Sequence, residues 1–316
     1  MKYGLLKYRD KESNIGDYIQ SLAALHFLPH VDKLVSREKL DKVSEDLYVI
    51  LNGWFMHHPE HWPPSEHVTP EFISFHINEH AKRLMTNKKS IAYYKKHEPI
   101  GCRDKFTEKL LKSKGVDAYF SGCLTLTLEK NQYLKDEKAD VIFCDILSHK
   151  NDVVDEGQKI PWKKIRNPHK VVIKKTKKEL FKKKTRKLVK KLVPSQLRKD
   201  AIYVSNQNFE ATTHEEKFEI AKNLLAKYAA AKLVVTSRIH VALPCLAFGT
   251  PVVFIHPERD TSRLSGLIEL FHTFTIKQIE ETPKEELQQQ FLKASVKNKD
   301  LHLKLRDDLI KNLQNK

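Results

Sequence analysis

Short apolar runs alternate along the chain with longer segments in which apolar residues recur every three or four positions. The runs are typical of buried strands, and the longer segments have the spacing of amphipathic helices. Strands are expected at residues 3–8, 47–51, 89–94, 116–120, 141–145, 201–205, 232–236 and 251–255. Helices are expected at residues 17–27, 105–113, 215–230 and 238–248, with one or two closing helices in 283–316. Strands that alternate with helices in this way predict an α/β fold with parallel sheets.

The alternation breaks once, between residues 150 and 200, and then restarts. The chain has 316 residues, of which 40 % are hydrophobic, so it is long and apolar enough for two folded domains. The sequence therefore predicts an N-terminal domain in residues 1–150 and a basic connecting segment in residues 151–200. A C-terminal domain with a helical tail is expected in residues 201–316.

The net charge of +17 is concentrated in residues 170–199, which hold 14 of the 57 Lys and Arg residues and one acid, Glu179. Apolar residues recur within this stretch at near-helical spacing: Leu180, Phe181, Leu188, Val189, Leu192 and Val193. Such a basic helix can lie on an anionic membrane surface, bind another polyanion, or dock its apolar stripe on its own domain. Nucleic acid is the least favoured partner, because no DNA-binding pattern accompanies the charge.

Other features restrict the class of protein. The four cysteines are widely spaced without a Cys-x-x-Cys pair, which argues against a disulfide framework or a zinc site and favours a reducing compartment. Four histidines share an irregular, proline-containing stretch, and we expect no metal site there: His57, His58, His61 and His67. Residues 239–257 are uncharged but broken by prolines and a glycine, and the first ten residues are too polar for a signal peptide. We expect a cytoplasmic protein without a bound metal or cofactor.

Glycine is scarce, yet five of the nine glycines fall in motifs that look like strand-to-helix turns. These motifs are Asn14-Ile15-Gly16-Asp17, Asn52-Gly53-Trp54, Gly101-Cys102-Arg103-Asp104, Ser121-Gly122-Cys123 and Phe248-Gly249-Thr250-Pro251. In open parallel sheets, ligands bind at the carboxyl ends of the strands, where such turns lie. Glycine at these positions lets the backbone approach a ligand, so the turns predict a binding site.

The sharpest candidate is Ser237-Arg238-Ile239-His240, which follows the expected strand at 232–236. Ser237 is expected to cap the next helix, which places Arg238 and His240 in its first turn. This end of a helix favours anions, so two cationic side chains there make sense if an anion binds between them. Arginine offers a bidentate fork to phosphate or carboxylate, and histidine can transfer a proton. The alternative is a surface ion pair for Arg238 and a hydrogen-bonded, half-buried His240.

Three weaker candidates lie in the N-terminal half. Asp104 is expected to cap the helix at 105–113, which sets Arg103 at the mouth of the turn as a second anion-binding cation or simply as a partner of Asp104. Asn14 and Asp17 either cap a helix or offer hydrogen bonds to sugar hydroxyls, and Asp17 could also act as a base. Trp54, beside Asn52, could stack on a sugar ring or be a partly buried loop residue. His76 is a possible contact, although a core or surface role is favoured.

Taken in order, these motifs resemble those of the polysaccharide pyruvyl transferases. The resemblance rests on the turns at 14–17, 52–55, 101–104 and 121–127, and above all on the stretch from Ser237-Arg238-Ile239-His240 to Phe248-Gly249-Thr250-Pro251. It runs from about residue 1 to 265 and leaves out the basic segment and the C-terminal tail.

The resemblance implies two Rossmann-like domains in a GT-B-like arrangement with a cleft between them, the first facing the acceptor and the second the donor. It implies transfer of the pyruvyl group of phosphoenolpyruvate onto a sugar of a polysaccharide or glycan, as a ketal, with release of phosphate. Arg238, Ile239 and His240 resemble the donor-binding Arg-Leu-His of the family, and Arg103 resembles a further donor contact. His240 would then be the acid that protonates the enol carbon, with a pKa near neutral unless anions raise it. The turns with Gly16 and Asn52 would face the acceptor.

Two other readings stay open. A GT-B glycosyltransferase could hold the diphosphate of a nucleotide sugar with Arg238 and its ribose with Glu258 or Asp260. A non-catalytic relative could bind glycans and be tethered to a membrane or polyanion by the basic segment. The acceptor glycan could itself be lipid-linked, which would place the protein at the inner face of a membrane.

Overall fold

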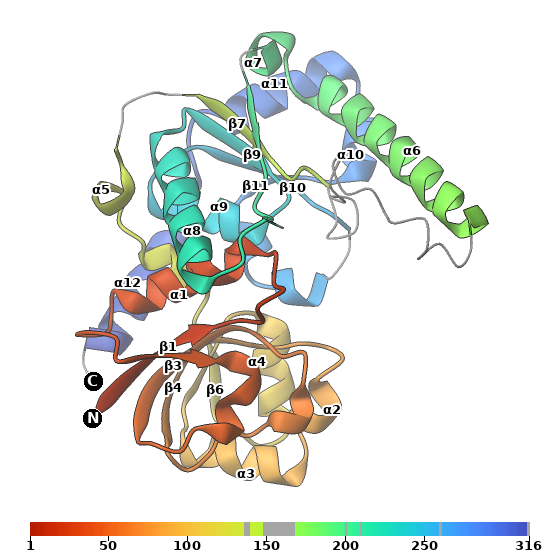
Figure 1. Cartoon of the computed structure of the whole chain (residues 1–316). Coiled ribbons are helices and arrows are strands. Elements are labelled where there is room, and N and C mark those ends of the chain that lie inside the picture. The colour runs from red at the N-terminus through yellow and green to blue at the C-terminus, as the bar shows by residue number, and fades with distance from the viewer. Residues whose placement is uncertain (136–139, 148–167, 200, 209, 259–260, 315–316) are drawn as a thin grey trace.

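Two parallel β-sheets with flanking helices make up the computed structural model of the chain (Figure 1). The structure describes residues 1–135, 140–147, 168–199, 201–208, 210–258 and 261–314. Every strand pair within the two sheets is parallel. The predicted α/β class is therefore confirmed.

The first sheet has six strands in the order β2-β1-β3-β4-β5-β6. Its strands are β1 (Lys2–Lys7), β2 (Lys33–Ser36), β3 (Leu47–Phe55), β4 (Val68–Ile77), β5 (Ile100–Cys102) and β6 (Ala118–Phe120). The helices along this part of the chain are α1 (Ile15–Leu25), α2 (Lys82–Met85), α3 (Lys88–Lys96), α4 (Lys105–Lys112) and α5 (Lys130–Tyr133).

The second sheet has five strands in the order β11-β10-β9-β7-β8. Its strands are β7 (Val141–Cys144), β8 (Ile202–Val204), β9 (Leu233–Thr236), β10 (Val252–Ile255) and β11 (His272–Phe274). The helices here are α6 (Pro168–Leu192), α7 (Ser195–Lys199), α8 (His214–Ala230), α9 (Ile239–Ala247), α10 (Ile276–Glu281), α11 (Lys284–Ala294) and α12 (His302–Gln314). The chain thus enters the second sheet at β7, before residue 150. At its other end α12 returns to the first sheet, where Asn312 donates to the Tyr119 hydroxyl (3.2 Å).

Helix α1 joins the two halves of the molecule (Figure 1). Its buried side chains pack on the first sheet, and Tyr18 meets Phe218 of α8 with ring centroids 5.1 Å apart. The backbone N–H of Ile15 donates to the carbonyl of Asn206, in the loop after β8 (3.0 Å). One apolar cluster includes buried residues of α1, α8 and α9, so the start of α1 is anchored against the second sheet.

The expected strand at 89–94 is wrong, because these residues lie in α3. The Asn87 side chain caps this helix by accepting from the N–H of Ser90 (2.9 Å), and Ser90 and Tyr94, four positions apart, are its buried residues. A short apolar run fits a strand or one side of a helix equally well, and here the cap selects the helix. The ten-residue strand β4 was not predicted, because Pro70 and the prolines before it disguise its pattern.

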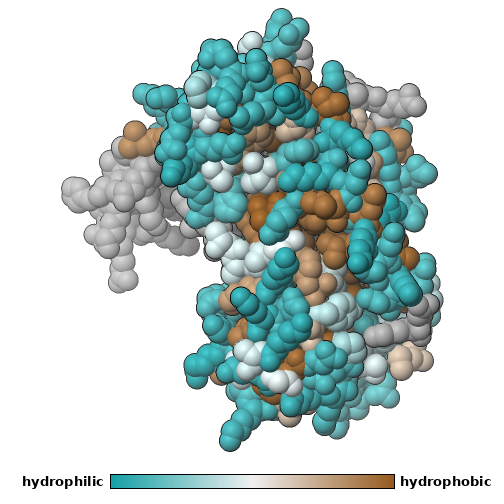
Figure 2. Space-filling view, turned by 180° about the vertical axis from the view of Figure 1, so that it is seen from behind, coloured by the Kyte–Doolittle hydropathy of each residue, from teal (hydrophilic) through white to brown (hydrophobic). Residues whose placement is uncertain are grey.

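The second half of the basic segment forms the end of α6 and docks on the second sheet. Leu188, Val189, Leu192 and Val193 are buried there, so the predicted apolar stripe is present. Leu180 is 62 % exposed, nearer the protruding start of the helix (Figure 1). The expected connecting residues 151–167 lie outside the described residues. None of the described helices has the length and apolar content to cross a bilayer. The face in Figure 2 is mostly hydrophilic, with apolar residues gathered at its middle.

Candidate functional site

Two motifs far apart in the sequence meet where α1 and α9 begin. The imidazole of His240, in the first turn of α9, packs against the backbone of Gly16, in the first turn of α1. A Cβ atom at position 16 would lie 3.0 Å from Cβ and 3.1 Å from Nδ1 of His240. Position 16 therefore requires glycine because the histidine lies so close. The side chain of Asn14 caps α1 by accepting from the N–H of Gly16 (3.3 Å), which confirms the capping alternative for Asn14.

The predicted cap of α9 is wrong. Arg238 is the N-cap residue, and its own side chain makes no capping hydrogen bond. The Ser237 hydroxyl oxygen instead accepts from the N–H of Leu147, just after β7 (2.9 Å). Thr236 accepts from the N–H of Arg238 (3.0 Å) and donates to the carbonyl of Cys144 (2.8 Å), which ties β9 to β7. The first turn of α9 is thus left without a side-chain cap, while Ile239 is buried in the core.

One side of the Arg238 guanidinium forms an ion pair with Asp145. Its Nε donates to Oδ2 of Asp145, directly after β7 (3.3 Å), and its side chain is 22 % exposed. Asp145 is fixed in turn by the Ser205 hydroxyl (2.8 Å) and the N–H of Asn206 (2.9 Å). The NH2 group Nη2 of Arg238 is buried and has no hydrogen-bond partner among the described residues. The alternative of an ion pair for Arg238 is therefore present, but Nη2 is still free to donate a hydrogen bond to a ligand.

The turn between β5 and α4 supplies a second arginine. Asp104 caps α4 as predicted, accepting from the N–H of Thr107 through Oδ1 (2.9 Å). Its Oδ2 lies 2.6 Å from Nδ1 of His76 and 3.7 Å from Nε of Arg103. Arg103 is 1 % exposed, and its Nε and Nη2 make no hydrogen bond within the described part of the chain. The predicted alternative, a pair with Asp104, is therefore present but leaves most of the guanidinium unsatisfied.

The electrostatics show that these groups form one site. Burial, and then the charges of Arg103 and Arg263, hold the pKa of His240 well below its ordinary value, and His76 and Arg238 lower it further. Burial and then Arg103 lower the pKa of His76 to about 4. The expected near-neutral pKa of His240 is thus wrong for the ligand-free protein, where both imidazoles are neutral at pH 7. The site is strongly electropositive.

Several buried donors in this site lack partners, which indicates what it binds. His240 Nε2 joins Nε and Nη2 of Arg103 and Nη2 of Arg238 as buried atoms without a hydrogen-bond partner in the described structure. Each unsatisfied buried group costs about 1–3 kcal/mol, more when charged, so such groups are rare in native proteins. An anion with several oxygens would satisfy these donors and offset the field of the arginines. Phosphate and carboxylate groups both fit.

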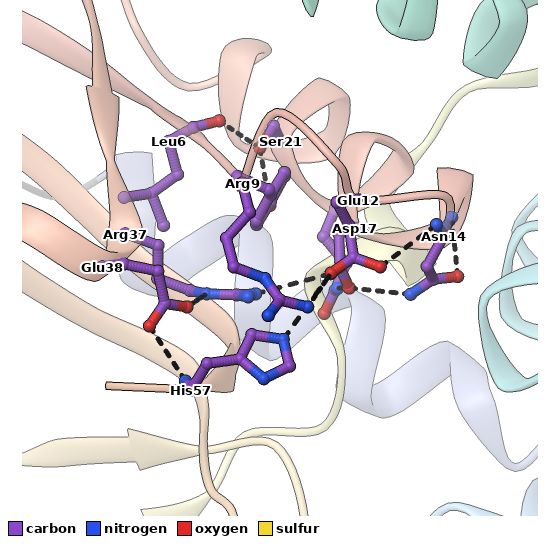
Figure 3. Close-up of polar contacts among 12 residues, drawn as sticks. Leu6, Arg9, Glu12, Asn14, Asp17, Ser21, Arg37, Glu38 and His57 are labelled. Atoms are coloured by element: carbon purple, nitrogen blue, oxygen red, sulfur yellow. Dashed lines mark hydrogen bonds and ion pairs between the residues drawn. The ribbon is translucent and has the colours of Figure 1, made fainter. Parts of the chain in front are cut away.

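A second polar network lies beside the start of α1 (Figure 3). Asp17 is buried and accepts from Nδ2 of Asn14 (3.1 Å) and Nη1 of Arg37 (3.5 Å). Arg37 is fully buried, and its Nε donates to Glu38 (3.0 Å). Its guanidinium carbon lies over the rings of Tyr8 (4.7 Å) and Trp54 (4.9 Å). Asp17 is therefore engaged in an ion pair.

The remaining N-terminal candidates belong to this network. Trp54 is half-buried between Arg37 and the ring of His57, whose centroid lies 4.4 Å away. Asn52 is buried, and its Nδ2 donates to the carbonyl of Gln20 (2.9 Å). Its Oδ1 has no hydrogen-bond partner among the residues described. Trp54 matches the partly buried alternative.

The structure adds residues that the motifs did not single out. Arg263 lies in a 3₁₀ turn at Thr261–Leu264, and the neighbouring Ser265 accepts from the N–H groups of Lys105 and Phe106 at the start of α4. No local motif marks Arg263, which reaches the site through this contact. Asn206, buried beside Gly16, was also not predicted.

Two residues were proposed for a nucleotide ribose. Glu258 is exposed, and its Oε1 accepts from the N–H of Ile276 (3.1 Å), whereas Asp260 lies outside the described residues. No group of three or more His, Cys, Asp or Glu side chains in the described ranges could hold a metal ion.

Comparison with known proteins places the chain in a family. The sequence profile of the polysaccharide pyruvyl transferases matches residues 73–258, more than half of the chain and including Arg103, Arg238 and His240. A search of curated proteins finds no match. An uncharacterized protein from Klebsiella pneumoniae has a solved structure that is 13 % identical, with a TM-score of 0.43 and coverage of 86 % of this chain and 92 % of that one. By the match over residues 73–258, the chain belongs to the polysaccharide pyruvyl transferase family.

Proposed function

We propose that the protein transfers the pyruvyl group of phosphoenolpyruvate onto two hydroxyls of a sugar in a polysaccharide or glycan. The product is a cyclic ketal, and phosphate is released. The observation that carries this proposal is the group of buried, unpartnered donors on Arg103, Arg238 and His240 at the uncapped start of α9. Phosphoenolpyruvate carries a phosphate and a carboxylate on one small carbon skeleton, so it has enough oxygens for all these donors.

The two arginines have separate roles because they come from different sheets. Arg103 follows β5 of the first sheet, and Arg238 follows β9 of the second. We place one anionic group of the donor on each guanidinium, with the start of α9 adding its dipole. Fixed cations at this point stabilise the charge on phosphate as it leaves. The ion pair with Asp145 holds Arg238 in place before the donor arrives.

Proton transfer to the enol carbon falls to His240. When a sugar oxygen adds to C2 of the donor, C3 must gain a proton. His240 is neutral in the ligand-free site because burial and the arginines disfavour its charge. The negative charges of a bound phosphate and carboxylate offset part of the positive charge of the arginines. This raises the pKa of His240, so that the imidazole takes up a proton. Donor binding thus prepares the acid.

We place the acceptor beside the first sheet, near Asn52 and Trp54, in a GT-B-like arrangement of two Rossmann-like domains. The partly exposed Trp54 is one acceptor contact that we propose, and the unpartnered Oδ1 of Asn52 lies in the same network. Orientation of two hydroxyls toward C2 of the donor would supply much of the rate.

The basic end of α6 supports a location at an anionic membrane surface, which would suit a lipid-linked acceptor. Lys183, Lys187 and Lys190 are exposed, whereas the neighbouring Lys184 pairs with Glu280 (2.9 Å). Lysines near such a surface contribute about 1 kcal/mol each. Changing the three exposed lysines to Gln should reduce co-sedimentation with phosphatidylglycerol vesicles but not with phosphatidylcholine vesicles. Unchanged co-sedimentation would contradict the proposed location at an anionic membrane surface.

The direct test of function uses phosphoenolpyruvate with a panel of glycosides of the common hexoses and N-acetylhexosamines. Phosphate release and a glycoside mass increased by one pyruvate ketal are the expected results, with His26→Gln as a control altered outside the site. Phosphate release that needs no glycoside, or turnover of nucleotide sugars alone, would contradict the proposal.

A further inference from the structure

A second histidine lies beside the same cations, and the mechanism above gives it no role. His76 is on β4 and is 1 % exposed. Its pKa and that of His240 are both lowered by Arg103 and Arg263, and His76 itself lowers the pKa of His240. The two imidazoles therefore share the electrostatic field of one site, although they come from different sheets.

A β-bulge in β4 determines the face of the sheet on which the His76 side chain lies. Where β3 advances from Leu51 to Gly53, β4 advances from Phe72 to Phe75, so β4 carries one extra residue. Phe72 and Phe75 consequently share a face, with ring centroids 5.1 Å apart, and His76 takes the opposite face. The extra stretch includes Ser74, whose φ of 56° is unusual for a residue other than glycine. Bulges of this kind are frequent beside active sites.

Asp104 fixes which nitrogen of His76 carries the proton. The carboxylate accepts from the N–H (2.9 Å) and the hydroxyl (3.0 Å) of Thr107 on Oδ1. Nδ1 of His76 forms a hydrogen bond with the same Thr107 hydroxyl oxygen (3.2 Å) and lies 2.6 Å from Oδ2 of Asp104. Although burial opposes ionisation, His76 and Arg103 keep the pKa of Asp104 below its usual value. Because the Thr107 hydroxyl gives its hydrogen to Asp104, its oxygen can only accept from Nδ1, so Nδ1 bears the hydrogen and Nε2 keeps its lone pair. No hydrogen bond of the described residues involves Nε2.

We infer that His76, oriented by Asp104, is the base that removes the proton of the attacking sugar hydroxyl. The inference rests on the proposed function and deepens it. A neutral imidazole with Nδ1 held by a carboxylate presents Nε2 as a proton acceptor, as in the Asp–His pairs of hydrolases. One histidine cannot do both jobs, because the hydroxyl needs a base while C3 of the donor needs an acid.

The proton balance closes with two histidines. In the first step, the hydroxyl proton passes to Nε2 of His76 as its oxygen bonds to C2, and the C2=C3 electron pair takes a proton from His240. In the second step, the other hydroxyl bonds to C2 while the C2–O bond to phosphate breaks and phosphate leaves with the electron pair. The second hydroxyl proton returns to His240, and the proton on His76 leaves with phosphate. Both histidines are then in their starting states.

The test compares His76→Gln with His26→Gln, the same change at an exposed histidine whose Nε2 lies 3.2 Å from the Tyr133 hydroxyl, away from the site. Turnover of phosphoenolpyruvate with the best glycoside is followed from pH 3.5 to pH 9, together with the Kd of phosphoenolpyruvate and the Tm. His76→Gln should lower kcat about 10²–10⁴-fold, keep the Kd within about threefold, and remove the acidic limb of the pH profile. His26→Gln should match the unchanged protein.

Retention of kcat within about threefold in His76→Gln would overturn the role of His76 while leaving the proposed function intact. No turnover by the unchanged protein would overturn the proposed function first, and this role with it. If His76→Gln fails to fold, ¹⁵N NMR of the unchanged protein decides. A His76 signal with hydrogen on Nδ1 supports the base, and hydrogen on Nε2 in the ligand-free protein overturns it.

Discussion

Two buried arginine clusters lie close together in this molecule and differ in how their charge is balanced. Arg37 stands between two carboxylates, Asp17 and Glu38, with aromatic rings over its guanidinium. Arg103 has one carboxylate, Asp104, which it shares with His76 at a shorter distance. The Arg37 cluster is compensated from within the protein. In the cluster around Arg103, Arg238 and His240, each arginine lies beside a single carboxylate in the described structure, and buried atoms of all three side chains have no hydrogen-bond partner there.

The comparison separates a structural ion network from a binding site. A buried charge with its partners in place stabilises the fold only modestly, but removing one partner is costly. Buried cations without enough partners lower stability until a ligand supplies the missing charge. The same residue types thus indicate structure at one place and function at the other, and the partners, not the residue types, distinguish them.

The largest effects are expected on activity. His240→Ala removes the acid, so turnover should fall by at least about 10³-fold while phosphoenolpyruvate still binds, more weakly. Arg238→Ala removes a contact to the anion itself, so both binding and turnover should be lost. Steady-state rates and calorimetric Kd values measure the two effects. Near-normal turnover in His240→Ala would show that another group protonates C3.

Stability should respond by different amounts in the two clusters. Arg37→Met leaves Asp17 and Glu38 buried without their cation and should lower the free energy of unfolding by about 3–5 kcal/mol. Arg103→Met leaves Asp104 with the hydrogen bonds from Thr107 and the contact with His76, so it should lower the free energy of unfolding by only about 1–2 kcal/mol. Urea unfolding of both variants without ligand provides the comparison. Equal losses in the two variants would mean that the clusters do not differ in the way described.

The pH dependence of stability should be smaller but diagnostic. His76 and His240 have pKa values below their ordinary value in the folded protein, so the unfolded chain binds protons more readily. The free energy of unfolding should therefore fall as pH drops below about 6.5, by up to about 1.4 kcal/mol per pH unit for each histidine, down to about pH 4 for His76. His240→Gln should flatten this slope. A slope unchanged by that substitution would show that His240 is not held neutral.

Local signals made part of the site predictable. Asp104 and Asn14 cap their helices within a few residues, so their positions followed from the sequence. The cationic pair at the start of α9 was also a local pattern. Its meeting with Gly16 was not derivable from spacing alone, because two sheets must pack before the residues touch.

The parts that were missed depend on long-range contacts. Ser237 does not cap α9, because its hydroxyl oxygen accepts from the N–H of Leu147, just after the neighbouring strand β7. The aim of His76 depends on a bulge in β4, whose extra residue shows only against its partner strand. Arg263 reaches the site because its turn is fastened to the start of α4. None of these contacts is marked in the sequence by a hydrophobic periodicity or by a motif of fixed spacing.

The central claim is that the unpartnered buried atoms of Arg103, Arg238 and His240 bind phosphoenolpyruvate. Calorimetric titration at pH 7, in two buffers of different ionisation enthalpy, tests it most directly. The account predicts binding with net proton uptake, because the bound anion raises the pKa of His240, and loss of both in Arg238→Ala but not in His26→Gln. Absence of binding, or binding without proton uptake that survives Arg238→Ala, would contradict it.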